Sequence, residues 1–218
     1  MIRRLTLTVV LSLVTALSAF AQDGSAPRYQ EGVQYVRLDE PVRVRSRDKI
    51  EVVEIFWYGC HHCYTLEAPL EAWERQLSDD VDFWRSPVVW NPLTELHARA
   101  YYIAQALGIE EKMHPALFQA INVDRNPLNN QARLRDFFVA RGGVDAEAFD
   151  KAFKAFGVTS QVNQAKARTL SYKIQGTPTL IVNGTYRITG QGVASQAEQL
   201  EVVNFLIERE RAARASAD

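Results

Sequence analysis

The sequence predicts an α/β fold in which a block of helices interrupts the strand-forming segments. Three observations support this prediction: a strand–helix–strand pattern over residues 50–89, a helical stretch without strand signals over 91–173, and renewed strand character after it. A strand, a helix and a second strand within about forty residues form a βαβ unit with parallel strands. We therefore expect one α/β domain, residues 22–90 and 174–218, split by a helical insertion domain, residues 91–173.

The first 21 residues are predicted to be a cleaved export signal and not part of the fold. A pair of arginines precedes an apolar run that ends at Leu17, and Ala19-Phe20-Ala21 has the small residues of a cleavage site. The apolar run is shorter than the roughly 20 residues that a membrane-spanning helix needs. We expect an exported mature chain that begins at Gln22.

Charge and size limit the classes of function. The full chain has 25 basic and 26 acidic residues, a formal net charge of −1. This near balance provides no basic field for nucleic acid and no polybasic membrane patch, so we expect no nucleic-acid partner. A mature chain of this length can bury a core as a monomer without a stapling disulfide.

Three apolar segments supply the first part of the expected α/β domain. Val33–Leu38 is predicted to be an edge strand. Ile50–Trp57 is almost continuously apolar, which is typical of a strand covered on both faces, and Val81–Val89 is predicted to be its parallel neighbour. Between these two strands, apolar residues recur at helical spacing from Cys60 onward, and Pro69 is expected to kink that helix.

The insertion is predicted to contain five helices. Their approximate ranges are 96–107, 110–121, 130–141, 145–156 and 159–172. Gly108 and the pair Gly142-Gly143 are expected to end the first and third helices, because glycine readily adopts the left-handed conformation that follows a helix. Gly157 is likewise expected to end the fourth helix, and Thr159 to cap the start of the fifth.

Strand character returns after the insertion. Thr179–Val182 and Thr185–Ile188 flank Asn183-Gly184, a strong signal for a two-residue hairpin turn. An amphipathic helix, Ser195–Arg211, is expected to follow and to pack against the sheet.

Both cysteines lie in one tetrapeptide, Cys60-His61-His62-Cys63, between a strand and a helix. A disulfide across so short a loop contributes only about 2 kcal/mol to stability in the chain-entropy estimate, whereas a structural bond would join distant segments. The pair is therefore interpreted as a redox-active dithiol that exchanges disulfides with other proteins.

The position of the pair assigns different roles to the two sulfurs. Cys60 is expected at the helix N-terminus, where unpaired N–H groups and the helix dipole favour a thiolate. His61 and His62 would add donors or positive charge near that sulfur. We predict that Cys60 is the attacking and attacked sulfur, that Cys63 resolves the mixed disulfide, and that the low pKa of Cys60 makes the pair an oxidant.

Other uses of these residues fit the sequence less well. A zinc site would need His61 and His62 to converge with both cysteines, which adjacent residues cannot easily do, and no second cysteine pair exists. A c-type haem would need histidine at the position of Tyr64. We expect no metal and no organic cofactor. His97 and His114 are interpreted as surface or structural histidines.

A second informative segment is Gly176-Thr177-Pro178-Thr179, just before the hairpin. Pro178 can be a simple strand start, since proline cannot donate to the sheet. It can also be a cis proline beside the cysteines, which would expose the Thr177 backbone for pairing with an extended substrate. These residues alone favour neither interpretation.

Two segments carry a resemblance to a known family. They are Phe56-Trp57-Tyr58-Gly59-Cys60-x-His62-Cys63-Tyr64 and Gly176-Thr177-Pro178-Thr179. Together they resemble the thioredoxin superfamily, and the helical block narrows the resemblance to the DsbA-type periplasmic disulfide oxidants. The resemblance extends over the whole mature chain. His61 stands where this family usually has proline, and Thr177 where several members have valine.

The resemblance implies a thioredoxin-like fold, a cis Pro178 and a periplasmic location. It also implies oxidation of thiol pairs in unfolded or folding exported proteins, and re-oxidation by a quinone-linked inner-membrane partner of the DsbB type. Glu54, Glu67 and Arg85 match positions where the family keeps charged residues beneath the active site. These three residues are expected either to tune the thiol pKa or to form a structural ion cluster.

Two alternative functions remain open at this stage. A disulfide isomerase of this compartment usually adds a dimerisation domain, which is not visible here, and a reductase would have a higher Cys60 pKa. A peptide-binding chaperone with an incidental pair of cysteines would keep its activity with serine at both positions.

Overall fold

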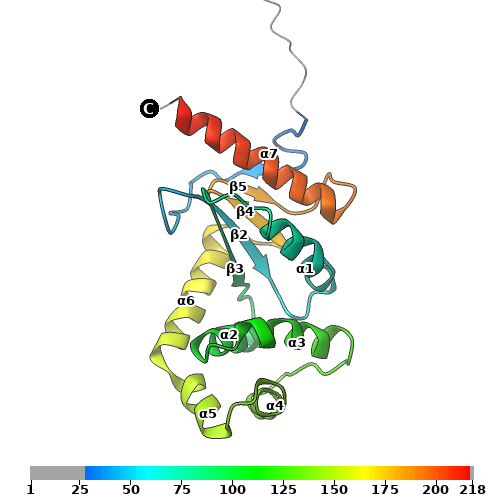
Figure 1. Cartoon of the computed structure of the whole chain (residues 1–218), viewed down its shortest axis with the longest axis vertical. Helices are drawn as coiled ribbons and strands as arrows, with labels where there is room; N and C mark the ends of the chain where they lie inside the picture. The colour runs from blue at the N-terminus through cyan, green and yellow to red at the C-terminus, as the bar shows by residue number, and fades with distance from the viewer. Residues whose placement is uncertain (1–27, 217–218) are drawn as a thin grey trace, which may run out of the picture.

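The computed structural model describes residues 28–216. The predicted export signal and its cleavage site lie outside the described residues. Helices α2 to α5 gather at one end of the molecule, α7 lies at the other end, and the sheet is between them (Figure 1). This is the predicted arrangement of an α/β part interrupted by a helical block. None of the described helices combines the length and the apolar character needed to span a bilayer.

The sheet has five strands in the order β1-β5-β4-β2-β3. Strand β2 (Ile50–Phe56), in which all residues are buried, lies between the parallel strand β3 (Val81–Pro87) and the antiparallel strand β4 (Thr179–Val182). The hairpin partner of β4 is β5 (Tyr186–Ile188). The parallel register places Glu54 of β2 opposite Arg85 of β3.

The edge strand β1 is shorter than predicted. It comprises only Val36–Arg37, whereas strand character was expected from residue 33. Gly32 adopts a left-handed conformation (φ 84°), and its N–H donates to the Tyr35 carbonyl at 2.8 Å. The chain therefore forms a turn here, and it pairs with the short strand β5 only after that turn.

Two helices flank the sheet in the α/β part. Helix α1 (His61–Glu74) contains Pro69 in its interior and connects β2 to β3. Helix α7 (Gln196–Ala215) begins after Ser195, whose hydroxyl accepts the Glu198 N–H, and it extends beyond the predicted end at Arg211. Apolar side chains of α1, α7 and the sheet form one buried cluster.

The helical block consists of five α-helices and one π-helical turn. Their bounds are α2 (Pro92–Ala106), α3 (Glu110–Asn122), α4 (Gln131–Phe137), the π-helical turn η1 (Phe138–Gly142), α5 (Ala146–Lys154) and α6 (Phe156–Ser171). Gly108 (φ 67°) and Gly143 (φ 76°) are left-handed, so the predicted ends of the first and third helices are confirmed.

The boundary between α5 and α6 was predicted wrongly. Gly157 does not end α5, and Thr159 does not cap α6, because α6 already begins at Phe156. The break is made by Ala155 alone, which is extended (φ −62°, ψ 136°). The Thr159 N–H donates to the Ala155 carbonyl at 3.1 Å within the first turn of α6, and the Thr159 hydroxyl accepts from Arg99 at 3.2 Å instead of capping the helix.

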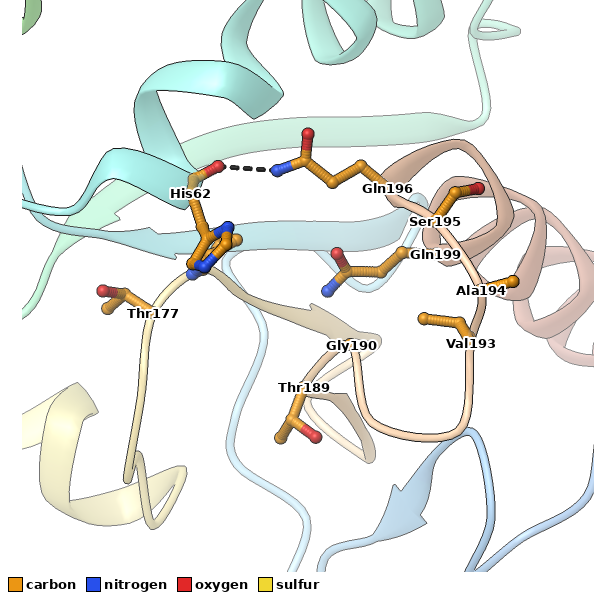
Figure 2. Close-up of a pocket in the computed structure, with 10 residues that line it drawn as sticks. His62, Thr177, Thr189, Gly190, Val193, Ala194, Ser195, Gln196 and Gln199 are labelled. Carbon is orange, nitrogen blue, oxygen red and sulfur yellow. Dashed lines mark hydrogen bonds between the residues drawn. The ribbon is translucent and has the colours of Figure 1, made fainter.

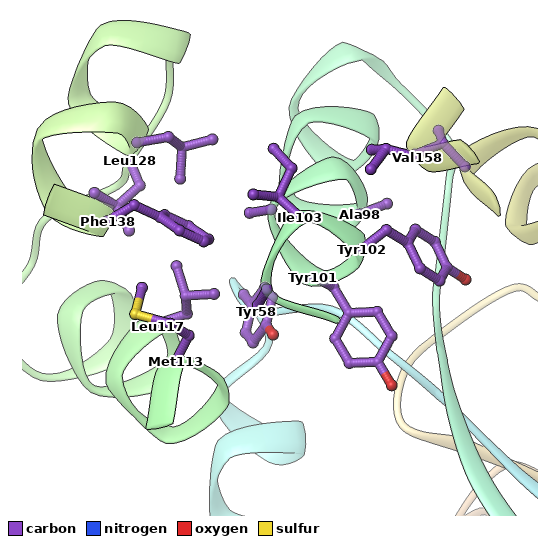
Figure 3. Close-up of a cluster of buried hydrophobic side chains, with 14 of the residues drawn as sticks. Tyr58, Ala98, Tyr101, Tyr102, Ile103, Met113, Leu117, Leu128, Phe138 and Val158 are labelled. Carbon is purple, nitrogen blue, oxygen red and sulfur yellow. The ribbon is translucent and has the colours of Figure 1, made fainter. Parts of the chain in front are cut away.

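The core of the helical block reaches the cysteine pair. Figure 3 shows Tyr58, from the loop after β2, among side chains of the helical block such as Met113 and Leu117. Phe56 and Cys63 belong to the same buried cluster. The end of β2 and the start of α1 are therefore fixed from both sides, by the sheet and by the helical block.

Candidate active site

Cys60 is the N-cap of α1, where the chain leaves β2 and enters the helix. Its backbone is extended (φ −94°, ψ 113°), and its N–H donates to the Trp57 carbonyl at 2.9 Å. Gly59 is required in this turn because a Cβ there would lie 2.4 Å from the Trp57 ring. The backbone N–H of Cys63 donates to Cys60 Sγ at 3.4 Å. The sulfur thus lies at the unpaired N–H groups of a helix start, as predicted.

The environment of Cys60 favours its thiolate. A hydrogen bond from the Cys63 side chain is the main cause that lowers the pKa of Cys60 from 9.0 to about 5. The Thr177 side chain and the backbone N–H groups of Cys63 and His62 act in the same direction, while partial burial acts against them. At neutral pH the reduced protein therefore carries a negative sulfur at position 60.

Cys63 has the opposite character. Its side chain is fully buried, and burial raises the pKa of the Cys63 thiol well above its ordinary value. The hydrogen bond with Cys60 and the charge of Glu54 raise this pKa further. Both cysteines are free in the structure, so it describes the dithiol state. In this state Cys60 is an ionised, partly exposed nucleophile, and Cys63 is a protonated, inaccessible partner.

The loop before β4 lies directly against Cys60. The Thr177–Pro178 peptide bond is cis, which confirms what the family resemblance implied for Pro178. The Thr177 carbonyl oxygen lies 3.2 Å from Cys60 Sγ. The structure therefore brings together two segments that are far apart in the sequence, the cysteine motif and the proline motif.

Two surface pockets meet at Thr177 and Pro178. The first also includes His62, and its other wall is the turn that leads into α7 (Figure 2). There the Gln196 side chain donates to the His62 carbonyl at 2.7 Å. The second pocket is lined by β1 and the loop before it. An extended peptide lying across Thr177 and Pro178 would pass directly beside the sulfur of Cys60.

The two histidines of the motif are on the surface. Both His61 and His62 are exposed, and the rings of the pair are 6.4 Å apart. Among the hydrogen bonds of the described residues, neither imidazole contacts Cys60 Sγ; His62 contributes through its backbone N–H. The thiolate-tuning role of both imidazoles stays a prediction.

The three charged residues predicted beneath the site form one ion network. Arg85 Nε lies 3.3 Å from Glu54 Oε2, and the other two guanidinium nitrogens lie 3.6 Å from Glu67 and 3.5 Å from Glu74. Glu54 is fully buried, and burial raises its pKa well above the ordinary value. The charges of Glu67 and Cys60 raise it further, and Arg85 opposes this rise.

His114 also belongs to this network, and the sequence did not indicate it. Its Nδ1 lies 2.8 Å from the Tyr58 hydroxyl, and its Nε2 lies 3.2 Å from Glu67 Oε2. Burial holds the pKa of Tyr58 well above its ordinary value, so the phenol stays protonated and can donate to Nδ1. The contact between Nε2 and the Glu67 carboxylate is close but does not have the geometry of a hydrogen bond. Only the packing of α3 against α1 reveals this contact.

His97 has the structural role that was predicted, and the buried, hydrogen-bonded His114 fits the same prediction. His97 is buried, accepts from the Trp57 indole N–H at 3.0 Å through Nδ1, and faces the Pro127 carbonyl at 3.1 Å through Nε2. Burial lowers the pKa of His97, so the ring is neutral at pH 7. Within residues 28–216, no group of three or more His, Cys, Asp or Glu side chains is arranged to hold a metal ion.

Comparisons with known proteins agree with this geometry. The family model of the DSBA-like thioredoxin domain matches residues 90–202. The thiol:disulfide interchange protein DsbA of Pseudomonas aeruginosa is 36% identical, over 97% of this chain and 98% of the relative. That of Azotobacter vinelandii is 38% identical, over 97% and 100%. The chain belongs to the DsbA family.

Solved structures support the same assignment. The crystal structure of Pseudomonas aeruginosa DsbA has a TM-score of 0.81 at 36% identity and covers 86% of this chain and 97% of that one. The DsbA oxidoreductase of Xylella fastidiosa has a TM-score of 0.78 at 34% identity, over 84% and 98%. The predicted thioredoxin-like fold and the predicted enzyme class are confirmed: this DsbA-family chain is a thiol:disulfide oxidoreductase acting on thiol-containing proteins.

Proposed function

We propose that Cys60 and Cys63 are the redox pair with which this chain introduces disulfides into exported proteins. The observation that supports this most directly is the contrast between the two thiols. Cys60 lies beside the cis-proline loop with a pKa of about 5, whereas Cys63 is buried and its pKa is raised. A sulfur that is stable as an anion is a good leaving group, and so its disulfide is readily transferred to a substrate.

The exchange proceeds in two steps. A substrate thiolate attacks Cys60 Sγ of the oxidised pair, a substrate–Cys60 disulfide forms, and the Cys63 sulfur leaves and is protonated. A second substrate thiolate then attacks the substrate sulfur of this mixed disulfide, and Cys60 leaves as a thiolate. Two electrons pass from the substrate dithiol to the cysteine pair, and the substrate gains one disulfide.

The buried carboxyl group of Glu54 is part of the proposed proton transfer to Cys63. The Cys63 sulfur must gain a proton when it leaves, because burial disfavours its anion. Glu54 is the buried carboxyl whose charge acts on Cys63, and its own raised pKa keeps it protonated over a wider pH range. We assign Glu54 as the group that exchanges a proton with Cys63, while Arg85 and Glu67 set its pKa.

The substrate chain is proposed to bind in extended form across Thr177 and Pro178. Both residues belong to the two pockets that meet beside Cys60, so a peptide can be held on either side of its reacting cysteine. The Thr177 carbonyl is already directed at Cys60 Sγ and can accept a backbone N–H from the peptide.

Single substitutions test the roles of the two sulfurs. The Cys63→Ser variant should form a stable mixed disulfide with a peptide that contains a disulfide, because Cys60 attacks and no second thiol resolves the adduct. The Cys60→Ser variant should form little adduct, because the Cys63 thiol is protonated and buried. Mass spectrometry of both variants measures the adducts, and equal trapping would contradict the assignment.

The direction of exchange is tested by equilibration with glutathione. An oxidant with the Cys60 pKa found here should be largely reduced by a small excess of reduced glutathione. An equilibrium constant typical of a strong reductant would refute the oxidant role and favour the reductase alternative.

The last part of the proposed function concerns the cellular location of the mature chain and the protein that re-oxidises it. We place the mature chain in the periplasm, as a monomer that begins at Gln22, with re-oxidation by a quinone-linked inner-membrane protein of the DsbB type. The apolar N-terminal segment and the family membership support this placement. The N-terminal residue and the native mass of the exported protein test the cleavage site and the monomeric state.

A further inference from the structure

A polar cavity lies on the side of the molecule formed by β3, α2 and α6, apart from the two pockets at Pro178. Its volume is about 270 Å³. The side chains that line it are those of Arg45, Trp84, Arg85, Tyr101, Tyr102, Gln105, Gln161, Gln164 and Arg168. Three of these carry a guanidinium group, and none is a carboxylate. The wall therefore offers many hydrogen-bond donors and a positive charge.

Two of the arginines stand over the same aromatic ring. The guanidinium carbon of Arg45 is 4.8 Å from the centroid of the Trp84 ring, and that of Arg168 is 5.0 Å from it. Cation–π contact stabilises each guanidinium, but two like charges at one ring repel each other. A negative group bound in the cavity that both arginines line would offset this repulsion.

Neither arginine has a carboxylate partner within the part of the chain that the structure describes. Arg168 donates to the Ser86 hydroxyl at 3.0 Å and to the Tyr102 hydroxyl at 2.9 Å, both of them neutral groups. Arg45 takes part in no ion pair of residues 28–216. Arg85 differs, because its three nitrogens face Glu54, Glu67 and Glu74. The positive charge available to a ligand thus comes from Arg45 and Arg168.

Two acids lie near the cavity without lining it. Glu51 is buried and accepts the Arg45 backbone N–H at 2.9 Å, and burial raises the pKa of its carboxyl. Glu110 lies beside Tyr101, on the α3 side. These acids define the polarity of the site, because a ligand must place its negative groups toward Arg45 and Arg168 and away from Glu51 and Glu110.

We propose that this cavity binds a small multivalent oxyanion, with phosphate or carboxylate groups that contact the guanidinium groups of Arg45 and Arg168. Guanidinium groups donate paired hydrogen bonds to such anions, and the hydroxyl and amide groups of the wall supply further donors. A cation would be repelled, and an apolar ligand would leave the guanidinium groups unsolvated and unpaired.

Calorimetric titration with inorganic pyrophosphate and with citrate, at constant ionic strength, tests the proposal. We expect saturable binding of at least one anion with one site per chain. The stronger of the two ligands tells whether the site prefers phosphate or carboxylate groups. Arg168→Gln should weaken binding about ten-fold or more, because it removes charge-assisted hydrogen bonds.

Lys166→Gln is the matched control. It removes the same charge from the same helix, but Lys166 is exposed and does not line the cavity, so affinity should be unchanged. Because Arg168 also bonds Ser86 and Tyr102, Arg45→Gln provides a second variant on an exposed side chain, with Arg47→Gln as its control. The proposal is wrong if neither anion binds saturably, or if the control variants weaken binding as much as the cavity variants.

Discussion

The ionisation of Cys60 predicts how the stability of the reduced protein depends on pH. Its pKa is about 5 in the folded chain, against an ordinary thiol value of 9.0. Because the folded pKa is the lower one, the thiolate contributes fully to stability above pH 9.0, and the contribution is lost as pH falls through 5. Between these limits each pH unit changes the free energy of unfolding by about 1.4 kcal/mol.

The magnitude at neutral pH follows from these values. From pH 5 to pH 7 the reduced protein should gain about 2.3 kcal/mol from Cys60 alone, because half of the thiols are already ionised at pH 5. The sulfur is partly open to solvent, which screens its interactions, so we expect a measured gain of about 1.2–2.3 kcal/mol. Cys63 contributes nothing in this range, because its pKa is raised and its thiol is protonated in both folded and unfolded chains.

Urea denaturation of the reduced protein, followed by far-ultraviolet circular dichroism between pH 4 and pH 8, measures this gain. The Cys60→Ser variant, denatured in parallel, contains all other titrating groups. The difference in unfolding free energy between the two proteins should be flat below pH 5 and should rise steadily above it. A difference that stays constant from pH 4 to pH 8 would refute the reasoning, since Cys60 would then be an ordinary thiol.

Three further predictions concern the network and the fold. Glu54→Gln should leave the pKa of the attacking thiol, measured by thiolate absorbance at 240 nm, close to the wild-type value, because the raised pKa of Glu54 keeps this carboxyl protonated where Cys60 titrates. The variant should instead slow disulfide exchange, because it removes the group that exchanges a proton with Cys63, whereas Glu74→Gln, at the half-exposed edge of the network, should slow it less. His114→Gln should change the pH profile of disulfide exchange because it removes the imidazole beside the Glu67 carboxylate, whereas His97→Gln should reduce stability only. Gly157→Ala should stabilise the chain by about 0.5–1 kcal/mol, because this glycine lies in a helix and a Cβ there would meet open space. Thermal melts measure the effect, and a loss of stability would instead support the helix end that the sequence predicted at Gly157.

Local patterns in the sequence were enough to predict the order of the elements and a cysteine pair that exchanges disulfides. These features depend on local patterns: the apolar run of β2, the helical spacing after Cys60 and the Asn183-Gly184 turn. Local patterns also place a sulfur at a helix N-terminus, since a strand followed directly by a helix leaves few residues for the turn. The errors were local as well, because glycine at position 157 indicates a helix end only if its backbone is left-handed, which it is not.

Contacts between distant segments became visible only in the folded chain. The approach of Thr177 to Cys60, the link from His114 to Glu67, and the two guanidinium groups over Trp84 each join residues from different elements. The spacing of apolar residues along the sequence does not predict such contacts, because they depend on how the helices pack on the sheet and not on the pattern within one element. The pKa values of the buried carboxyl and thiol groups belong to the same class, since burial is a property of the packed molecule.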